Sequence, residues 1–101
     1  MMNKQNLTSK KIIRMIEKHK NDLVRFNVTK IGLFGSFSKR PSNDSDIDFL
    51  VEFKKPTFDN YMGLKFMLEN LFNRKVDLVI EKELKPALKY VKKEAIYAKG
   101  L

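Results

Sequence analysis

The segment DIDFLVEF, residues 46–53, constrains the fold more than any other stretch of this chain of 101 residues. Its three consecutive apolar residues, Phe49, Leu50 and Val51, are typical of a strand that is buried on both faces. A strand of this kind lies inside a sheet that other elements cover. The segment therefore predicts a central strand with two aspartates at its beginning.

The residues before this strand predict a helix, a second strand and a loop. Apolar spacing over residues 10–26 predicts one helix with Thr8 or Ser9 as its N-cap, and with His19 as an ordinary packed side chain. The sequence VTKIGLFGS predicts a strand that ends at Gly35, and the polar residues 39–45 predict a loop.

The residues after the central strand predict a helix, a strand and a last helix. Asp59 is the expected N-cap of the first helix, Asn73 its end, KVDLVI the strand, and Pro86 the start of the last helix. The fold class is therefore α+β, with a small mixed β-sheet flanked by helices. We expect one domain over residues 1–101, with a flexible N-terminus at residues 1–8.

The two aspartates of the central strand, Asp46 and Asp48, predict a metal site. Residues i and i+2 of a strand point to the same face, about 6.6 Å apart. At an effective dielectric constant near 20, two such charges repel by about 2–3 kcal/mol. A divalent cation between them relieves this repulsion, and oxygen ligands favour Mg²⁺ or Mn²⁺. The pair alone leaves an alternative open, in which the two aspartates are solvated acids at the end of a strand or in a turn.

A third acid, Asp77 of KVDLVI, completes the predicted site if its strand lies beside the central one. It is a single acid in an apolar strand, where charges are rarely buried without a partner. Three carboxylates on one face suit phosphoryl transfer assisted by two cations. Asp44 lies in the predicted loop and is interpreted as a turn former.

A glycine–serine pair, Gly35 and Ser36, closes the first strand eleven residues before Asp46. Glycine lets the backbone approach a ligand closely, and successive N–H groups in such a turn can hold a phosphate. The Ser36 hydroxyl can donate one more hydrogen bond to it. By itself the pair is a common turn, so its meaning depends on the aspartates that follow.

The pattern of Gly-Ser, a polar loop, S-D-I-D and a later V-D-L-V resembles the signature of the DNA polymerase β-like nucleotidyltransferase superfamily. With its short length, the chain looks like a minimal nucleotidyltransferase (MNT) domain over residues 28–97. Such domains are typically encoded beside a HEPN-domain protein as a toxin–antitoxin pair. The resemblance implies that this chain is the antitoxin.

The resemblance implies a Mg²⁺-dependent transfer of AMP from ATP to a hydroxyl, expected to be a tyrosine of the HEPN-type RNase toxin. Gly35 and Ser36 would hold the triphosphate, and Asp46 and Asp48 would bind two Mg²⁺ ions, with Mn²⁺ as a substitute. Asp77 would bind the cation that activates the acceptor and help to deprotonate it. The alternative within the same fold is a weak or inactive enzyme that neutralises the toxin by direct binding in a hetero-oligomer.

The loop after Gly35-Ser36 departs from the family's pattern. Members commonly carry a basic residue followed by glycine, whereas this chain has Lys39, Arg40 and then Pro41. We expect Lys39 and Arg40 to reach the nucleotide phosphates, and solvated loop charges remain the alternative.

The composition limits the kinds of partner, metal site and cell compartment that we expect for this protein. The formal net charge of +9 favours an acidic partner or a nucleotide, although a basic surface that merely aids solubility is the plain alternative. No cysteine and one histidine exclude thiolate and histidine-rich metal sites. We expect a cytoplasmic protein without a membrane span or a signal peptide. No nucleic-acid-binding motif is present, so direct binding of nucleic acid is not predicted.

Overall fold

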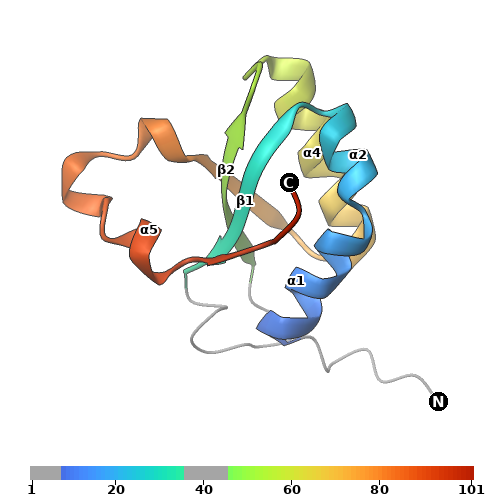
Figure 1. The fold of residues 1–101 in the computed structure, drawn as a ribbon, viewed down its shortest axis with the longest axis horizontal. Helices are drawn as coiled ribbons and strands as arrows, with labels where there is room; N and C mark the ends of the chain where they lie inside the picture. The colour runs from blue at the N-terminus through green and yellow to red at the C-terminus, as the bar shows by residue number, and fades with distance from the viewer. Residues whose placement is uncertain (1–7, 36–45) are drawn as a thin grey trace.

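The structure, a computed structural model, describes residues 8–35 and 46–101 (Figure 1). The expected loop at 39–45 and residues 1–7 of the expected flexible N-terminus lie outside these described residues. Within them, four strands form one mixed sheet in the order β3-β2-β1-β4. The strands are β1 (Val28–Phe34), β2 (Ile47–Phe53), β3 (Val76–Ile80) and β4 (Ile96–Tyr97).

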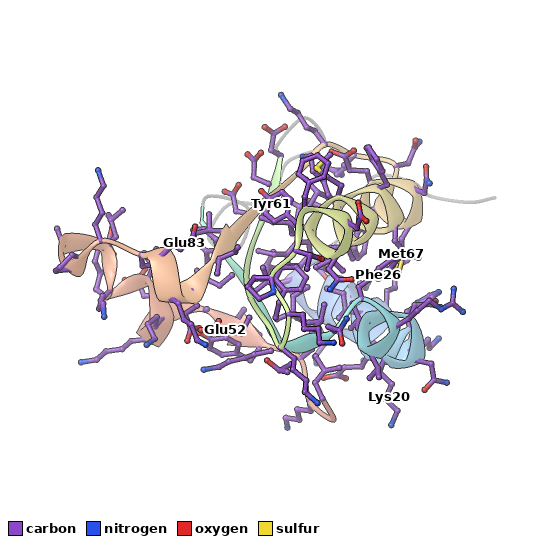
Figure 2. All side chains as sticks on the ribbon, turned by 90° about the horizontal axis from the view of Figure 1, so that it is seen from above. Lys20, Phe26, Glu52, Tyr61, Met67 and Glu83 are labelled. Atoms are coloured by element: carbon purple, nitrogen blue, oxygen red, sulfur yellow. The ribbon has the colours of Figure 1, made fainter. Side chains whose placement is uncertain are left out.

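Helices cover one face of the sheet, and the last part of the chain covers the other. In Figure 1 the helices lie to the right of β1 and β2, while residues 81–97, here called the C-terminal segment, lie to the left. The helices are α1 (Ser9–Lys18), α2 (Lys20–Arg25) and α4 (Phe58–Phe72). Figure 2 shows the same two sides, with Phe26 and Met67 on the helical side and Glu52 and Glu83 on the other. The α+β class with a mixed sheet and helices is therefore confirmed.

The central strand is β2, as its apolar run predicts. It pairs antiparallel with β1 and parallel with β3, and α4 makes the crossover that a parallel pair requires. Phe49 and Val51 pack into the core between sheet and helices. Leu50 points to the other face and is nonetheless 0% exposed, because the C-terminal segment lies over that face.

The first helix was predicted as one piece, but it is broken at His19. Thr8 caps α1 by accepting a hydrogen bond from the Lys11 N–H, as expected, and α2 begins at Lys20. The backbone of His19 leaves the helical region, and its Nδ1 lies 2.8 Å from the carbonyl oxygen of Met15. This break turns α2 so that Leu23 still enters the core. His19 is half-buried, in keeping with a packed side chain.

The start of α4 also differs from the prediction. Its N-cap is Thr57 rather than Asp59, because the Thr57 hydroxyl accepts a hydrogen bond from the N–H of Asn60. Asp59 lies in the first turn, where an acid favours the positive end of the helix dipole. Asn73 ends the helix in a left-handed conformation with φ of 53°, as expected.

The prediction of a last helix was wrong over most of its length. The C-terminal segment forms two 3₁₀ turns, Glu81–Glu83 and Pro86–Leu88, then the single turn α5 (Val91–Glu94) and β4. Short helices are marginal alone, so packing against the rest of the protein decides the structure of this segment. Pairing of β4 with β1 offers hydrogen bonds and burial instead, with Tyr97 opposite Gly32.

Glu81 fastens the C-terminal segment to the sheet. Its side chain is 7% exposed and accepts hydrogen bonds from Tyr97 Oη at 2.7 Å and Lys30 Nζ at 3.3 Å. Lys92 Nζ lies 3.6 Å from the same carboxylate. Burial raises the pKa of Glu81, but the hydrogen bonds from Tyr97 and Lys30 and the lysine charges outweigh it and hold the pKa below its ordinary value. No helix among the described residues is long and apolar enough to cross a membrane.

Candidate active site

The central feature of the site is a row of side chains across three neighbouring strands. Asp48 of β2 pairs with Phe34 of β1 on one side and with Asp77 of β3 on the other. The core residues of these strands alternate with this row, so the row lies on the face opposite the helices. We call Asp48 and Asp77, with Phe34 beside them, the acid row.

The carboxylates of the acid row repel one another. Burial raises the pKa of Asp48, and the charges of Asp77 and Asp46 and a hydrogen bond with the Asp77 side chain raise it further. Asp48 is half-buried, whereas Asp46 and Asp77 are exposed. A cation placed at this row would lower the pKa of Asp48 and favour its ionised form.

One expectation about the acids needs correction. Asp77 is not buried, because β3 is the outer strand of the sheet and the C-terminal segment leaves this position open. Asp46 lies one position before β2, and its charge acts on Asp48. Among residues 8–35 and 46–101, no three acidic, histidine or cysteine side chains are arranged to hold a metal ion.

Gly35 brings the end of β1 against the acid row. Its φ of +86° is a conformation that side chains rarely adopt, and a Cβ added there would overlap the carboxylate of Asp48. The glycine was predicted for close approach of the backbone to a ligand, and the close approach that the structure shows is to Asp48. Ser36, Lys39 and Arg40, the other predicted nucleotide-binding residues, lie outside the described part of the chain.

The donor set fits a hard divalent cation. Asp48 and Asp77 offer only carboxylate oxygens, which Mg²⁺ and Mn²⁺ prefer. The pKa of Asp48 is raised first by burial and then by the negative charges of Asp77 and Asp46. Asp46 is near enough to add to that charge and can turn toward a cation because it lies outside the strand. The residues present therefore fit a magnesium site.

A pocket that the sequence does not predict lies beside the acid row. It has a volume of about 460 Å³ and is lined by Phe34 and Gly35 of β1, Val79 of β3 and residues of the C-terminal segment. Those residues are Leu84, Leu88, Tyr90, Val91 and Glu94. The sequence predicts a helix that starts at Pro86, and such a helix gives no indication of this pocket. Only the placement of the C-terminal segment over the sheet creates the pocket.

Comparison with known proteins gives consistent results. The sequence profile of the nucleotidyltransferase domain family matches residues 16–99. The protein adenylyltransferase MntA of Thermococcus cleftensis is 38% identical over 95 residues, which are 90% of this chain and 96% of that protein. A solved structure assigned as a minimal nucleotidyltransferase superposes with a TM-score of 0.76 at 31% identity, covering 90% of this chain and 96% of that one.

A further likeness concerns the fold alone. A chain of the crystal structure of the toxin–antitoxin MntA–HepT superposes with a TM-score of 0.59 at 22% identity, over 87% of this chain and 73% of that chain. The family profile itself covers β1, β2 and β3, and so includes the whole acid row. The resemblance in the sequence is thereby confirmed, and with it the class of enzyme: the chain belongs to the nucleotidyltransferase domain family.

Proposed function

We propose that this protein is a Mg²⁺-dependent adenylyltransferase that moves AMP from ATP to a tyrosine hydroxyl of a HEPN-type RNase toxin and so acts as its antitoxin. The observation that carries the proposal is the acid row, in which Asp48 and Asp77 meet in register on neighbouring parallel strands. Support for the acceptor class comes from the relative named protein adenylyltransferase MntA. Support for a toxin partner comes from the MntA–HepT structure, which shares the fold.

The proposed roles of the acids follow from their positions. Asp46 and Asp48 would hold the cations that bind the triphosphate, and Asp77, the exposed member, would face the arriving acceptor. Mg²⁺, when bound, supplies charge neutralisation for the phosphates and makes the acceptor hydroxyl more acidic. Gly35 would bring backbone N–H groups close to the phosphates, with Ser36, Lys39 and Arg40 as further donors.

The proposed reaction forms one bond and breaks one. The tyrosine oxygen attacks the α-phosphorus of ATP, the bond between that phosphorus and the oxygen bridging to the β-phosphate breaks, and pyrophosphate leaves. The hydroxyl proton passes to the carboxylate of Asp77 or through it to water. Asp77, the proposed base, pairs in register with Asp48, the proposed cation ligand. The strand pairing therefore fixes the position of one carboxylate relative to the other.

The test is transfer of label from α-³²P-ATP, with Mg²⁺, to the product of the neighbouring gene, which we expect to be the HEPN-type toxin. We expect label on the partner with the unaltered protein and a loss of at least about 100-fold with Asp46→Ala/Asp48→Ala, in line with the usual cost of removing a group that stabilises transition-state charge. Asp22→Ala/Asp59→Ala is the matched control, because it removes two aspartates on the helical side of the sheet and should leave the transfer unchanged.

The same experiment separates the alternative function. If no label is transferred and the Asp46→Ala/Asp48→Ala protein still forms a tight complex that silences the RNase, the protein neutralises its partner by direct binding. If label is transferred, mass spectrometry of the partner identifies the acceptor residue. A modified serine or threonine would contradict the tyrosine acceptor and leave the adenylyltransferase activity in place.

A further inference from the structure

The apolar pocket begins one strand position beyond the acid row. On the face that carries Asp48, the next row is formed by Gly32, Leu50 and Val79, and strand residues two positions apart are separated by about 6.6 Å. Phe34 belongs to the acid row and also lines the pocket, so the two sites share a wall. A ligand that spans one sugar's length can therefore reach from the acids into the pocket.

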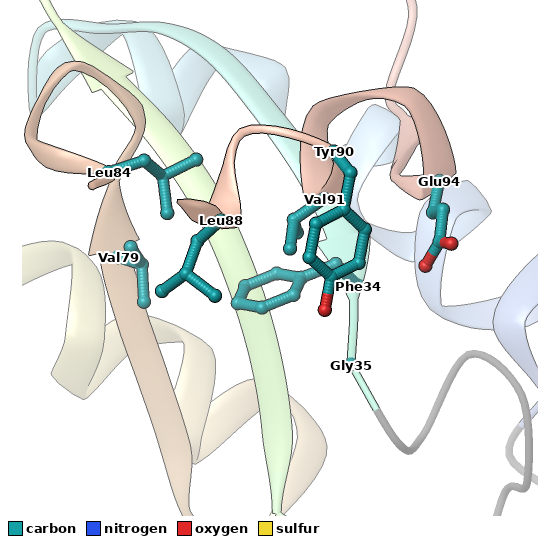
Figure 3. Close-up of a pocket in the computed structure, with 8 residues that line it drawn as sticks. All are labelled: Phe34, Gly35, Val79, Leu84, Leu88, Tyr90, Val91 and Glu94. Carbon is teal, nitrogen blue, oxygen red and sulfur yellow. The ribbon is translucent and has the colours of Figure 1, made fainter. Parts of the chain in front are cut away.

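The walls of the pocket are aromatic and aliphatic. Figure 3 shows Leu88, Val91 and Tyr90, all from the C-terminal segment, gathered around the ring of Phe34. Glu94 adds one carboxylate at the side of the pocket beyond Tyr90. A volume of about 460 Å³ lies in the range of small-molecule sites. Flat heteroaromatic groups stack on such rings, and a base–aromatic stack is worth about 1–3 kcal/mol.

The geometry points to the nucleotide as the occupant. The acids act on the α-phosphate, and the nucleoside is bonded to that phosphate, so the base must lie within one ribose of the acid row in every turnover. An acceptor side chain arrives on the surface of another protein and needs an open approach, which the exposed Asp77 already offers. A pocket walled by aromatic rings one strand position from the acids suits the base better.

We propose that the pocket between β1, β3 and the C-terminal segment binds the purine base of ATP, with Tyr90 stacking on the base and Phe34 forming the floor. This assignment rests on the nucleotide site proposed above. It gives the C-terminal segment a function, because that segment supplies Tyr90 and is fastened to the sheet by Glu81.

The test compares two ligands in calorimetric titrations of the full chain with Mg²⁺. One is the ATP analogue with a methylene group between the α- and β-phosphates, which AMP transfer cannot consume, and the other is inorganic tripolyphosphate, which lacks the base. We expect Tyr90→Ala to weaken binding of the analogue about 10-fold, which corresponds to ~1.4 kcal/mol. Binding of tripolyphosphate should stay the same. Tyr90→Phe, which keeps the ring, should bind the analogue as the unaltered protein does.

Phe66→Ala is the matched control, because Phe66 is as exposed as Tyr90, at 56%, and lies on α4 across the sheet. It should change neither affinity. The base pocket is contradicted if Tyr90→Ala weakens both ligands equally, if it weakens neither, or if the unaltered protein binds both ligands equally well. A Tyr90→Ala protein that binds the analogue normally but needs more partner for transfer would assign the pocket to the acceptor instead. Unaltered protein that binds neither ligand would contradict the nucleotide site itself, and the base pocket with it.

Discussion

Gly35 is the residue whose replacement most directly tests the geometry of the site. Gly35→Ala adds a methyl group that overlaps the Asp48 carboxylate and forces a left-handed backbone on alanine. We expect a loss of about 1–2 kcal/mol in the free energy of unfolding from the backbone alone, measured by urea titration. AMP transfer should also fall sharply, because the carboxylate of Asp48 must move aside.

Gly100→Ala separates these two effects. Gly100 has a φ of +88°, close to that of Gly35, but an added Cβ there meets only the end of the Lys20 side chain at 3.9 Å. It should carry a backbone cost without loss of AMP transfer. Equal transfer by the two variants would contradict the close approach of Gly35 to Asp48.

At the scale of elements, the start of α4 offers a clean comparison between two neighbouring polar residues. Thr57→Ala removes the hydroxyl that accepts from the Asn60 N–H, so it should lower the free energy of unfolding by about 1 kcal/mol. Asp59→Ala removes only an exposed first-turn charge and should cost less than half as much. Thermal unfolding followed by circular dichroism measures both effects. A larger loss for Asp59→Ala than for Thr57→Ala would mean that Asp59, not Thr57, is the N-cap.

The attachment of the C-terminal segment predicts a pH dependence. The pKa of Glu81 lies below its ordinary value of 4.5 in the folded protein, so the stability that its charge provides is present above about pH 4.5 and is lost as the pH falls through the folded-state pKa. Glu81→Gln should therefore cost about 2 kcal/mol at pH 7 and much less at pH 3, in urea titrations at both pH values.

Glu83→Gln is the control for this prediction. Glu83 lies in the same 3₁₀ turn and is exposed, so its replacement should change the stability little at either pH. If Glu81→Gln has the same cost at pH 3 as at pH 7, then packing rather than charge holds the segment. The segment also carries Tyr90, so a loosened attachment should weaken binding of the ATP analogue as well.

For the whole molecule, the repulsion in the acid row links metal binding to folding. A ligand that binds only the folded state stabilises it by RT ln(1 + [L]/Kd), or about 2.7 kcal/mol at a hundred times Kd. We expect the midpoint of thermal unfolding to rise with added Mg²⁺ and to fall back when EDTA removes it. The Asp46→Ala/Asp48→Ala protein should show no rise, whereas Asp22→Ala/Asp59→Ala should behave as the unaltered protein. A rise of the same size in all three would mean that Mg²⁺ acts elsewhere.

Much of the fold could be predicted from local pattern. The apolar run of β2 and the strands on either side of it are encoded by neighbouring residues, so burial on both faces was evident from Phe49, Leu50 and Val51. The acids Asp48 and Asp77 could be proposed as partners because a parallel β2–β3 pair joined by a helix brings equivalent strand positions together. The end of α4 at Asn73 was also local, since few other residues accept a left-handed backbone.

The sequence by itself predicted the first three strands in chain order and the burial of β2 on both faces, because runs of neighbouring apolar residues mark them. It also proposed Asp46, Asp48 and Asp77 as the acids of the site. Only the tertiary structure decided that residues 81–97 lie across the sheet, that Asp77 is exposed and that a pocket opens beside Asp48. These features depend on Glu81 meeting Lys30, 51 residues away, and on Tyr97 packing over Gly32. Helical propensity alone does not stabilise a short segment, so residues 81–97 adopt the conformation that gains burial and hydrogen bonds from the sheet.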